Sequence, residues 1–162
     1  MKNSERFKSI LGFIFFISIC FLTAWLGAQV SPGMASGDWY ATIQKPDWNP
    51  PSWVFGPVWS TLYTMMAIAA WIIWKKDGFA GAKMAMVLFF IQLLLNALWS
   101  QIFFRFQEIG WAFAEILFLL AAIGYTGFHF YKKDRVAGWL LVPYFGWVFF
   151  AAWLNYTIWI LN

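Results

Sequence analysis

Five long apolar runs, separated by polar segments, follow one another along the chain. They cover residues 7–30, 55–74, 84–104, 109–131 and 136–161. A helix needs about 20 mostly apolar residues to cross the hydrocarbon core of a bilayer, and each run is long enough. Because the runs are continuous rather than alternating, they predict helices and not the strands of a membrane barrel. We therefore expect an all-α membrane protein, a five-transmembrane-helix bundle.

The segment between the first two runs, residues 31–54, is longer than the other connections. It carries prolines and large aromatic residues that are unusual in a flexible linker: Trp39, Tyr40, Pro46, Trp48, Pro50, Pro51 and Trp53. Prolines reduce the conformational freedom of the unfolded chain, and long loops in compact domains are usually functional. We expect a packed lid loop between helices 1 and 2.

Composition supports the membrane interpretation and a single domain over residues 1–162. Hydrophobic residues make up 62% of the chain and charged residues 11%, against about 25% charged in a soluble domain. The net charge of +4 does not indicate nucleic-acid binding, because the basic residues form short clusters between apolar runs rather than one basic face.

The first apolar run is expected to be retained rather than cleaved as a signal peptide. Lys2, Arg6 and Lys8 would serve as a basic leader, but the run that follows is about twice the length of a signal core and lacks a clear cleavage site.

The distribution of lysine and arginine predicts the orientation. With the N-terminus inside, the outer segments carry only Lys45 and Arg105, and the inner segments carry all the others: Lys2, Arg6, Lys8, Lys75, Lys76, Lys83, Lys132, Lys133 and Arg135. Basic residues favour the cytoplasmic side. We therefore expect the N-terminus inside, and the first loop and the C-terminus outside.

Polar and aromatic residues recur on one face of three of the predicted helices. Gln92, Asn96 and Ser100 are spaced four residues apart, which places them on one helical face. The other members follow similar spacings: Phe55, Trp59 and Tyr63 in the second run, Trp99 in the third, and Trp147, Ala151, Leu154 and Asn155 in the fifth. These residues suit a pocket for a flat apolar ligand with polar edges. The alternative, favoured for Asn155 alone, is hydrogen bonding between helices.

No metal site is expected. The only cysteine, Cys20, lies within an apolar run, and the only histidine, His129, lies at the inner end of the fourth run. A haem iron would therefore find no usual axial ligand near the predicted pocket. Glu115 lies within the fourth run, and its role is left open between an interfacial and an inward-facing carboxylate.

Several stretches carry a resemblance to a known family. The first three are Trp39-Tyr40, Lys45-Pro46-x-Trp48-x-Pro50-Pro51 and Phe55-Gly56-Pro57-Val58-Trp59-x-x-Leu62-Tyr63. They resemble the TspO/MBR family, which comprises the tryptophan-rich sensory proteins and the mitochondrial translocator protein, also called the peripheral-type benzodiazepine receptor. Leu95-Asn96-Ala97-Leu98-Trp99-Ser100 looks like the signature of its third span. Trp139 to Asn155, with Pro143-Tyr144 and Trp147, looks like that of its fifth.

The resemblance implies a bacterial-type member with five helices that forms a homodimer in the cytoplasmic membrane. It also implies a pocket beneath the first loop for protoporphyrin IX or a related tetrapyrrole, and for aromatic drug-like ligands, with no cofactor required. Carried over by motif, the pocket residues are Tyr40, Trp48, Trp53, Phe55, Trp59, Tyr63, Asn96, Trp99, Ser100, Trp147, Ala151 and Leu154. A small-residue pair, Gly81 and Ala85, would permit the close helix approach of a dimer.

Three functions are compatible with this resemblance. The first is tetrapyrrole binding in sensing, stress response or porphyrin disposal. The second is light- and oxygen-dependent porphyrin degradation, for which the family implies Trp59 and Trp147 as the reactive residues. The third is transport of porphyrin-like amphipathic ligands, which is less favoured because the chain shows no internal repeat and only Pro143 suggests a helix break.

Cholesterol binding is unsupported. The animal members carry a C-terminal cholesterol motif that requires a basic residue after its aromatic one, and nothing basic follows Arg135 here.

Overall fold

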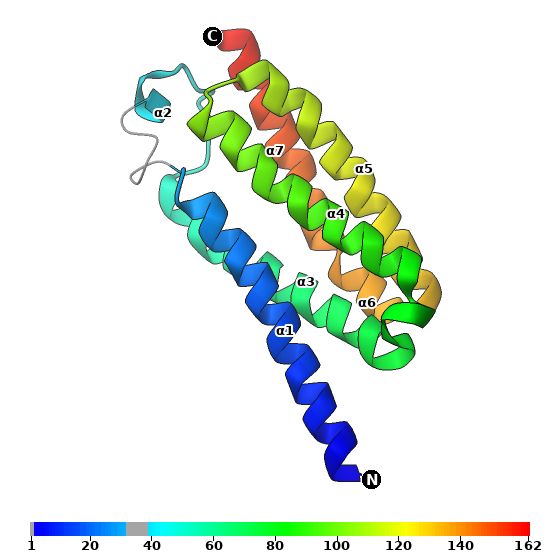
Figure 1. The fold of residues 1–162 in the computed structure, drawn as a ribbon. Helices are drawn as coiled ribbons and strands as arrows, with labels where there is room; N and C mark the ends of the chain where they lie inside the picture. The colour runs from blue at the N-terminus through cyan, green and yellow to red at the C-terminus, as the bar shows by residue number, and fades with distance from the viewer. Residues whose placement is uncertain (1, 32–38) are drawn as a thin grey trace.

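The computed structural model describes residues 2–31 and 39–162, so residues 32–38 of the predicted lid loop lie outside the described part. Five helical segments within the described residues are long and apolar enough to cross a membrane: Ser4–Ala28, Ser52–Gly81, Lys83–Arg105, Ile109–Lys133 and Arg135–Leu161. The prediction of an all-α, five-span bundle is confirmed. The N- and C-termini lie at opposite ends of the bundle (Figure 1).

The helices differ from the predicted runs mainly at their ends. Their bounds are α1 Lys2–Ala28, α2 Trp39–Thr42, α3 Ser52–Gly81, α4 Lys83–Ser100, the π-helical turn η1 Gln101–Arg105, α5 Ile109–Lys133, α6 Arg135–Leu140 and α7 Val142–Leu161. Helix α3 continues beyond the predicted residue 74, because polar Lys75, Lys76 and Asp77 extend the helix past the apolar stretch. Hydropathy finds the membrane-buried part of a helix and not its polar extension.

The fifth run consists of two helices. The Asp134 carboxylate caps α6 by accepting hydrogen bonds from the backbone N–H groups of Val136 (2.9 Å) and Ala137 (3.2 Å). Helix α6 ends before Leu141, and Pro143 lies in the first turn of α7. A proline there costs no helical hydrogen bond, because the first turn has no partner for its N–H.

The core lies where α1, α3, α4, α5 and α7 meet. Small residues line it on α3, among them Ala67, Ala69 and Ala70, and large rings fill the remaining space, including Phe16 and Phe89. Small residues permit helices to approach closely in a membrane.

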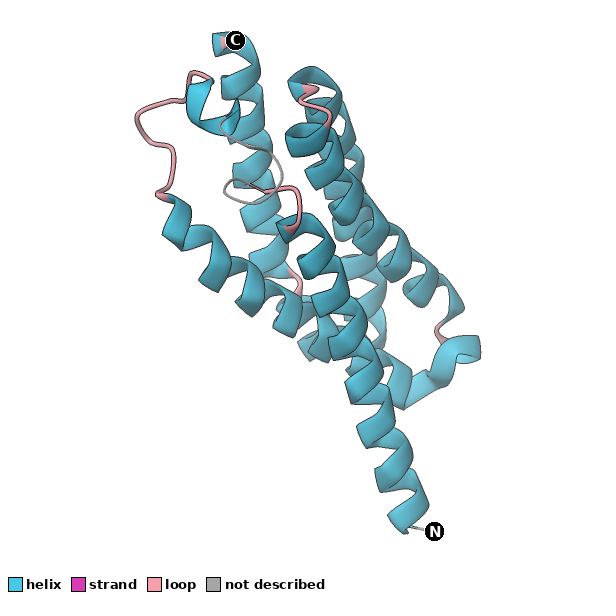
Figure 2. Cartoon of the chain, turned by 60° about the vertical axis from the view of Figure 1, so that its left-hand side comes forward, coloured by secondary structure: helices cyan, strands magenta, loops and turns pink. Residues whose placement is uncertain are grey.

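The two ends of the bundle differ in charge. The basic end carries Lys75, Lys76, Lys132 and Lys133. There Lys133 pairs with Asp77, and its Nζ also donates to the Gly81 carbonyl (2.9 Å), which joins α5 to α3. The opposite end, covered by residues 39–51, is the lid end. In Figure 2 the described lid connects α2, beside the C-terminus, to the start of α3.

The predicted dimerisation pair is not on one helix. Gly81 is the last residue of α3, whereas Ala85 lies in α4 and is buried in the core of its own chain. Because the pair is divided between two helices, it does not form the stripe expected of a helix–helix dimer motif.

Candidate functional site

A chain of hydrogen bonds joins three helices near the middle of the bundle. The Tyr63 hydroxyl from α3 donates to Oδ1 of Asn96 on α4, and Nδ2 of Asn96 donates to the Tyr144 hydroxyl on α7 (2.9 Å). All three side chains are buried. Buried polar groups need such partners, so Asn96 fixes the relative positions of α3, α4 and α7.

A second amide ties α7 to α4 and α5. The Trp99 indole N–H donates to Oδ1 of Asn155 (3.1 Å), and Nδ2 of Asn155 donates to the Ile109 carbonyl (2.9 Å). Asn155 therefore bonds helices together, which is the alternative favoured for it from sequence. The Trp99 N–H is already occupied, so this residue offers a ring face rather than a donor.

Aromatic rings from the lid, α3 and α7 meet in two groups at adjacent levels. In the first group, Phe150 lies 5.9 Å from Trp48 and 5.5 Å from Trp147, and Trp147 lies 5.9 Å from Phe55, measured between ring centroids. In the second group, Trp59 lies 5.5 Å from Tyr63 and 6.3 Å from Tyr144. We call these seven residues the aromatic cluster.

The cluster keeps ring surface available. Phe55, Trp59 and Trp147 are half-buried, whereas Tyr63 and Tyr144 behind them are buried. A flat ligand that separated the half-buried rings would gain stacking contacts on both faces, each worth about 0.5–1.5 kcal/mol beyond area burial.

The lid packs on a separate set of residues. Tyr40 lies 6.2 Å from Phe103 and 5.6 Å from Phe104 between ring centroids, and its hydroxyl donates to Oδ1 of Asn49 (3.2 Å). Nζ of Lys45 donates to the carbonyls of Tyr40 (2.6 Å) and Ile43 (2.9 Å). Burial raises the pKa of Tyr40. The described part of the lid is thus held by ring contacts and hydrogen bonds that involve Tyr40.

The remaining predicted residues divide between these regions. Leu154 is buried beneath the lid with Phe103, and half-buried Ala151 packs against the main core. Ser100 faces α1, because a Cβ placed on Gly27 would lie 3.1 Å from its hydroxyl oxygen. Trp53 is 75% exposed and belongs to no aromatic pair of the described residues. Neither Ser100 nor Trp53 joins the aromatic cluster.

The sequence matches the model of the TspO/MBR family over residues 16–160. The chain belongs to the TspO/MBR family. This match runs from the middle of α1 to the end of α7, so it includes the described lid and both levels of the aromatic cluster. Together with its five apolar helices, membership makes the chain a multi-pass membrane protein.

Relatives within the TspO/MBR family come from bacteria and from animals. The translocator protein of Homo sapiens is 40% identical over 139 residues, which cover 83% of this chain and 82% of the human one. The tryptophan-rich protein TspO of Chlorobaculum tepidum is 40% identical over 159 residues, covering 96% and 98%. The tryptophan-rich sensory protein of Cereibacter sphaeroides is 33% identical over 150 residues, covering 93% and 90%.

Some residues of the site in this TspO/MBR family member were not predicted from its sequence. Tyr144 accepts from Asn96 and lies beside Trp59, and Phe150 joins the lid to Trp147. Tyr144 could have been found from its place one turn before Trp147 on the same face. Asn49 and its contact with Tyr40 have no periodic signal, because both lie in the lid.

Proposed function

We propose that this protein binds a tetrapyrrole, protoporphyrin IX or a close relative, and acts in sensing, stress response or porphyrin disposal. The aromatic cluster is the observation that carries the proposal. Rings from the lid, α3 and α7 gather at one level, within 6 Å of one another between successive centroids. Phe55, Trp147 and Phe150 are half-buried, and Trp48 of the lid is exposed. A porphyrin is flat and aromatic, so it can replace these ring contacts with contacts of its own.

The polar groups near the cluster support the same interpretation. Asn96 and Asn155 already have their hydrogen bonds within the bundle. Stacking and shape would therefore contribute more to binding than direct amide contacts. The carboxylates of a porphyrin would extend toward the lid end, where Lys45 is the basic residue of the lid.

The test is a titration of protoporphyrin IX in the dark, followed by the porphyrin absorption band, because 13 tryptophans complicate intrinsic fluorescence. Trp59→Leu and Trp147→Leu each remove a ring face and should raise Kd about two- to tenfold. Trp139→Leu is the matched control, since Trp139 is exposed on α6 at the basic end. Absence of saturable binding at micromolar porphyrin would contradict the proposal.

A second candidate function is light- and oxygen-dependent degradation of the bound porphyrin. The position of Trp59 favours it, because its indole is half-buried and has the phenol rings of Tyr63 and Tyr144 as neighbours. Such a group of electron-rich rings can be oxidised by an excited porphyrin in the presence of oxygen. Trp147 lies at the adjacent level of the cluster.

Phenylalanine substitutions separate the two functions. Trp59→Phe with Trp147→Phe keeps two stacking surfaces but removes both indoles, so dark binding should remain while bleaching under light slows to the rate of free porphyrin. Equal bleaching by the wild type and this double variant would exclude a role for the indoles, whatever the dark binding shows.

We also propose that the basic end faces the cytoplasm of a bacterial cell and that the lid faces outward. Basic residues at one end of a bundle favour the cytoplasmic side. An introduced cysteine at Asp47 should react with a membrane-impermeant maleimide in intact cells, and one at Lys132 should react only after lysis. Cys20 is buried, so it should not react with the maleimide and need not be replaced.

A further inference from the structure

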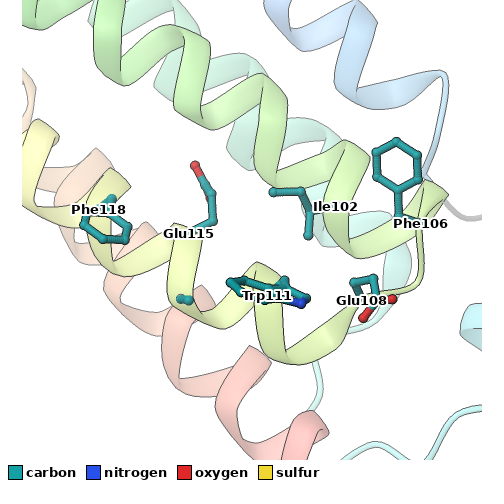
Figure 3. Close-up of a pocket in the computed structure, with 7 residues that line it drawn as sticks. Ile102, Phe106, Glu108, Trp111, Glu115 and Phe118 are labelled. Atoms are coloured by element: carbon teal, nitrogen blue, oxygen red, sulfur yellow. The ribbon is translucent and has the colours of Figure 1, made fainter.

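A hollow of about 490 Å³ lies on the outside of the bundle, between α5 and the segment that contains η1. Figure 3 labels six of the residues that line it: Ile102, Phe106, Glu108, Trp111, Glu115 and Phe118. We call it the acidic groove. It shares no residue with the aromatic cluster, so it is a different place on the molecule from the proposed porphyrin site.

Glu115 is the unusual member of the groove. Its side chain points from α5 toward α4 (Figure 3), and both carboxylate oxygens are buried without a hydrogen-bond partner among the described residues. Glu115 lies six residues into α5, roughly 9 Å along the helix from its start. A carboxylate at such a position in a membrane helix is costly unless it is protonated or paired. The groove therefore lacks a donor for this group.

No ion pair of the described residues involves Glu115. Both ion pairs within the described chain, Lys76–Asp134 and Lys133–Asp77, lie at the basic end. Lysine and arginine are absent from residues 106–131, 84–104 and 46–74 of the sequence. Arg105, next to the lining residue Phe106, ends η1 and lies before the start of α5, whereas Glu115 lies six residues into α5.

The surroundings of Glu115 suit a positive charge attached to an apolar body. Glu108 is the residue directly before α5, seven residues before Glu115, and Trp111 lies between them on the same side of the helix. Trp111 is 72% exposed and Phe118 is 70% exposed. Aromatic faces attract ammonium groups, and carboxylates pair with them, while the rest of the lining is apolar.

We propose that the acidic groove binds a membrane amphiphile whose head group is a protonated amine. The ammonium pairs with the Glu115 carboxylate, and the apolar body lies against Trp111 and Phe118. A zwitterionic phospholipid fits less well, because its phosphate would be brought close to the carboxylate of Glu108. The proposal does not depend on porphyrin binding.

The test compares two nitroxide-labelled probes in phosphatidylcholine vesicles that contain the protein. One is a long-chain alkylamine, and the other is the alcohol of the same chain length. The motionally restricted fraction of the electron paramagnetic resonance spectrum measures association with the protein. The wild type should enrich the amine several-fold over the alcohol.

Variants assign the preference to the groove. Glu115→Gln keeps the side-chain shape and should reduce the amine-to-alcohol ratio to about one, and Trp111→Leu should reduce it in part. Phe128→Leu is the matched control, because Phe128 lines an aromatic hollow without a carboxylate, together with Leu120, Ala121, Gly124, Tyr125 and Phe145. Its ratio should equal that of the wild type.

Two results would overturn the proposal. The first is an amine-to-alcohol ratio of about one in the wild type, which would also be found if a second copy of the chain covered the groove. The other is an undiminished ratio in Glu115→Gln. Thermal unfolding of each variant checks that a lost preference does not come from a lost fold. Porphyrin titration of the same samples shows whether porphyrin binding is retained, so failure of amine binding is distinguished from failure of the proposed function.

Discussion

The side chain of Asn162 binds both polar groups of the Gln44 backbone. Its Oδ1 accepts from the Gln44 N–H (2.9 Å), and its Nδ2 donates to the Gln44 carbonyl (3.0 Å). The same Nδ2 also donates to the Ile158 carbonyl within the last turn of α7 (2.8 Å). Asn162, the residue directly after α7, thereby holds the lid to that helix, although Gln44 and Asn162 are far apart in the sequence.

Loss of this contact should loosen the lid without unfolding the bundle. Exposed hydrogen bonds contribute about 0.5–1.5 kcal/mol each at most, so Asn162→Ala should accelerate hydrogen exchange at the Gln44 amide about two- to tenfold. Porphyrin association and dissociation should both become faster. Asn162→Asp retains the acceptor and should give an intermediate exchange rate. Unchanged exchange in Asn162→Ala would show that the lid is held by other contacts.

Asn96 should be the polar residue on which bundle stability depends most. Asn96→Ala leaves two buried phenols without their partner, so we expect a loss of about 1–3 kcal/mol in the free energy of unfolding. Unfolding in mixed micelles, followed by circular dichroism, measures this change. Leu98→Ala is the control, because Leu98 is on the exposed side of the same helix. Comparable losses in both variants would argue against a special role for the amide.

Two glycines provide an internal comparison of packing. A Cβ on Gly138 would lie 2.5 Å from Cβ and 2.7 Å from Cα of Tyr131, whereas a Cβ on Gly146 would meet nothing within 4 Å. Gly138→Ala must push α6 away from the end of α5 and should lower stability by about 1–3 kcal/mol. Gly146 is an exposed residue within α7, away from the ends of the helix. Gly146→Ala should therefore leave the free energy of unfolding unchanged or raise it by about 0.5–1 kcal/mol.

The same unfolding experiment tests both substitutions. A stable Gly138→Ala variant would mean that α5 and α6 can separate at little cost. A destabilised Gly146→Ala variant would place an unforeseen neighbour, such as a second copy of the chain, against that side of α7.

The closed lid should weaken at high pH because of Tyr40. Burial raises the pKa of this phenol in the folded lid, so the closed state holds its proton more tightly than the open state. The stabilisation is complete below the ordinary tyrosine pKa of about 10 and is lost as the pH rises through the raised folded value. Limited proteolysis of the lid should therefore accelerate at alkaline pH in the wild type. Tyr40→Phe should remove that part of the pH dependence, and an identical profile would contradict this account.

Most of the fold could be predicted from the sequence, because hydropathy alone identifies membrane-spanning helices. The sequence placed five spans and found the face of Asn96 from its four-residue spacing with Gln92 and Ser100. The partners on that face could not be predicted, since they depend on helix rotation. Asn96 meets two tyrosines, Ser100 faces α1, and the side chain of Gln92 is buried with no hydrogen-bond partner among the described residues.

The site was predictable where it follows helical periodicity and not elsewhere. Trp59 lies beside Tyr63, four residues further along α3, as their helical spacing indicated, and Phe55 lies beside Trp147 of α7. Trp53 lies in the first turn of α3, is exposed, and pairs with no aromatic ring of the described residues. The contact between Asn162 and Gln44 joins residues that are far apart in sequence, and no local pattern encodes such a pairing.

The bonds that hold the helices together inside the bundle are made by uncharged groups. Asn96 and Asn155 bind phenols, an indole and a carbonyl, whereas both ion pairs of the described residues lie at the basic end. Dissolved ions screen charges but leave neutral hydrogen bonds largely unaffected. The arrangement of α3, α4, α5 and α7 should therefore be the same in dilute buffer and in concentrated salt, and only the connections at the basic end should respond to ionic strength.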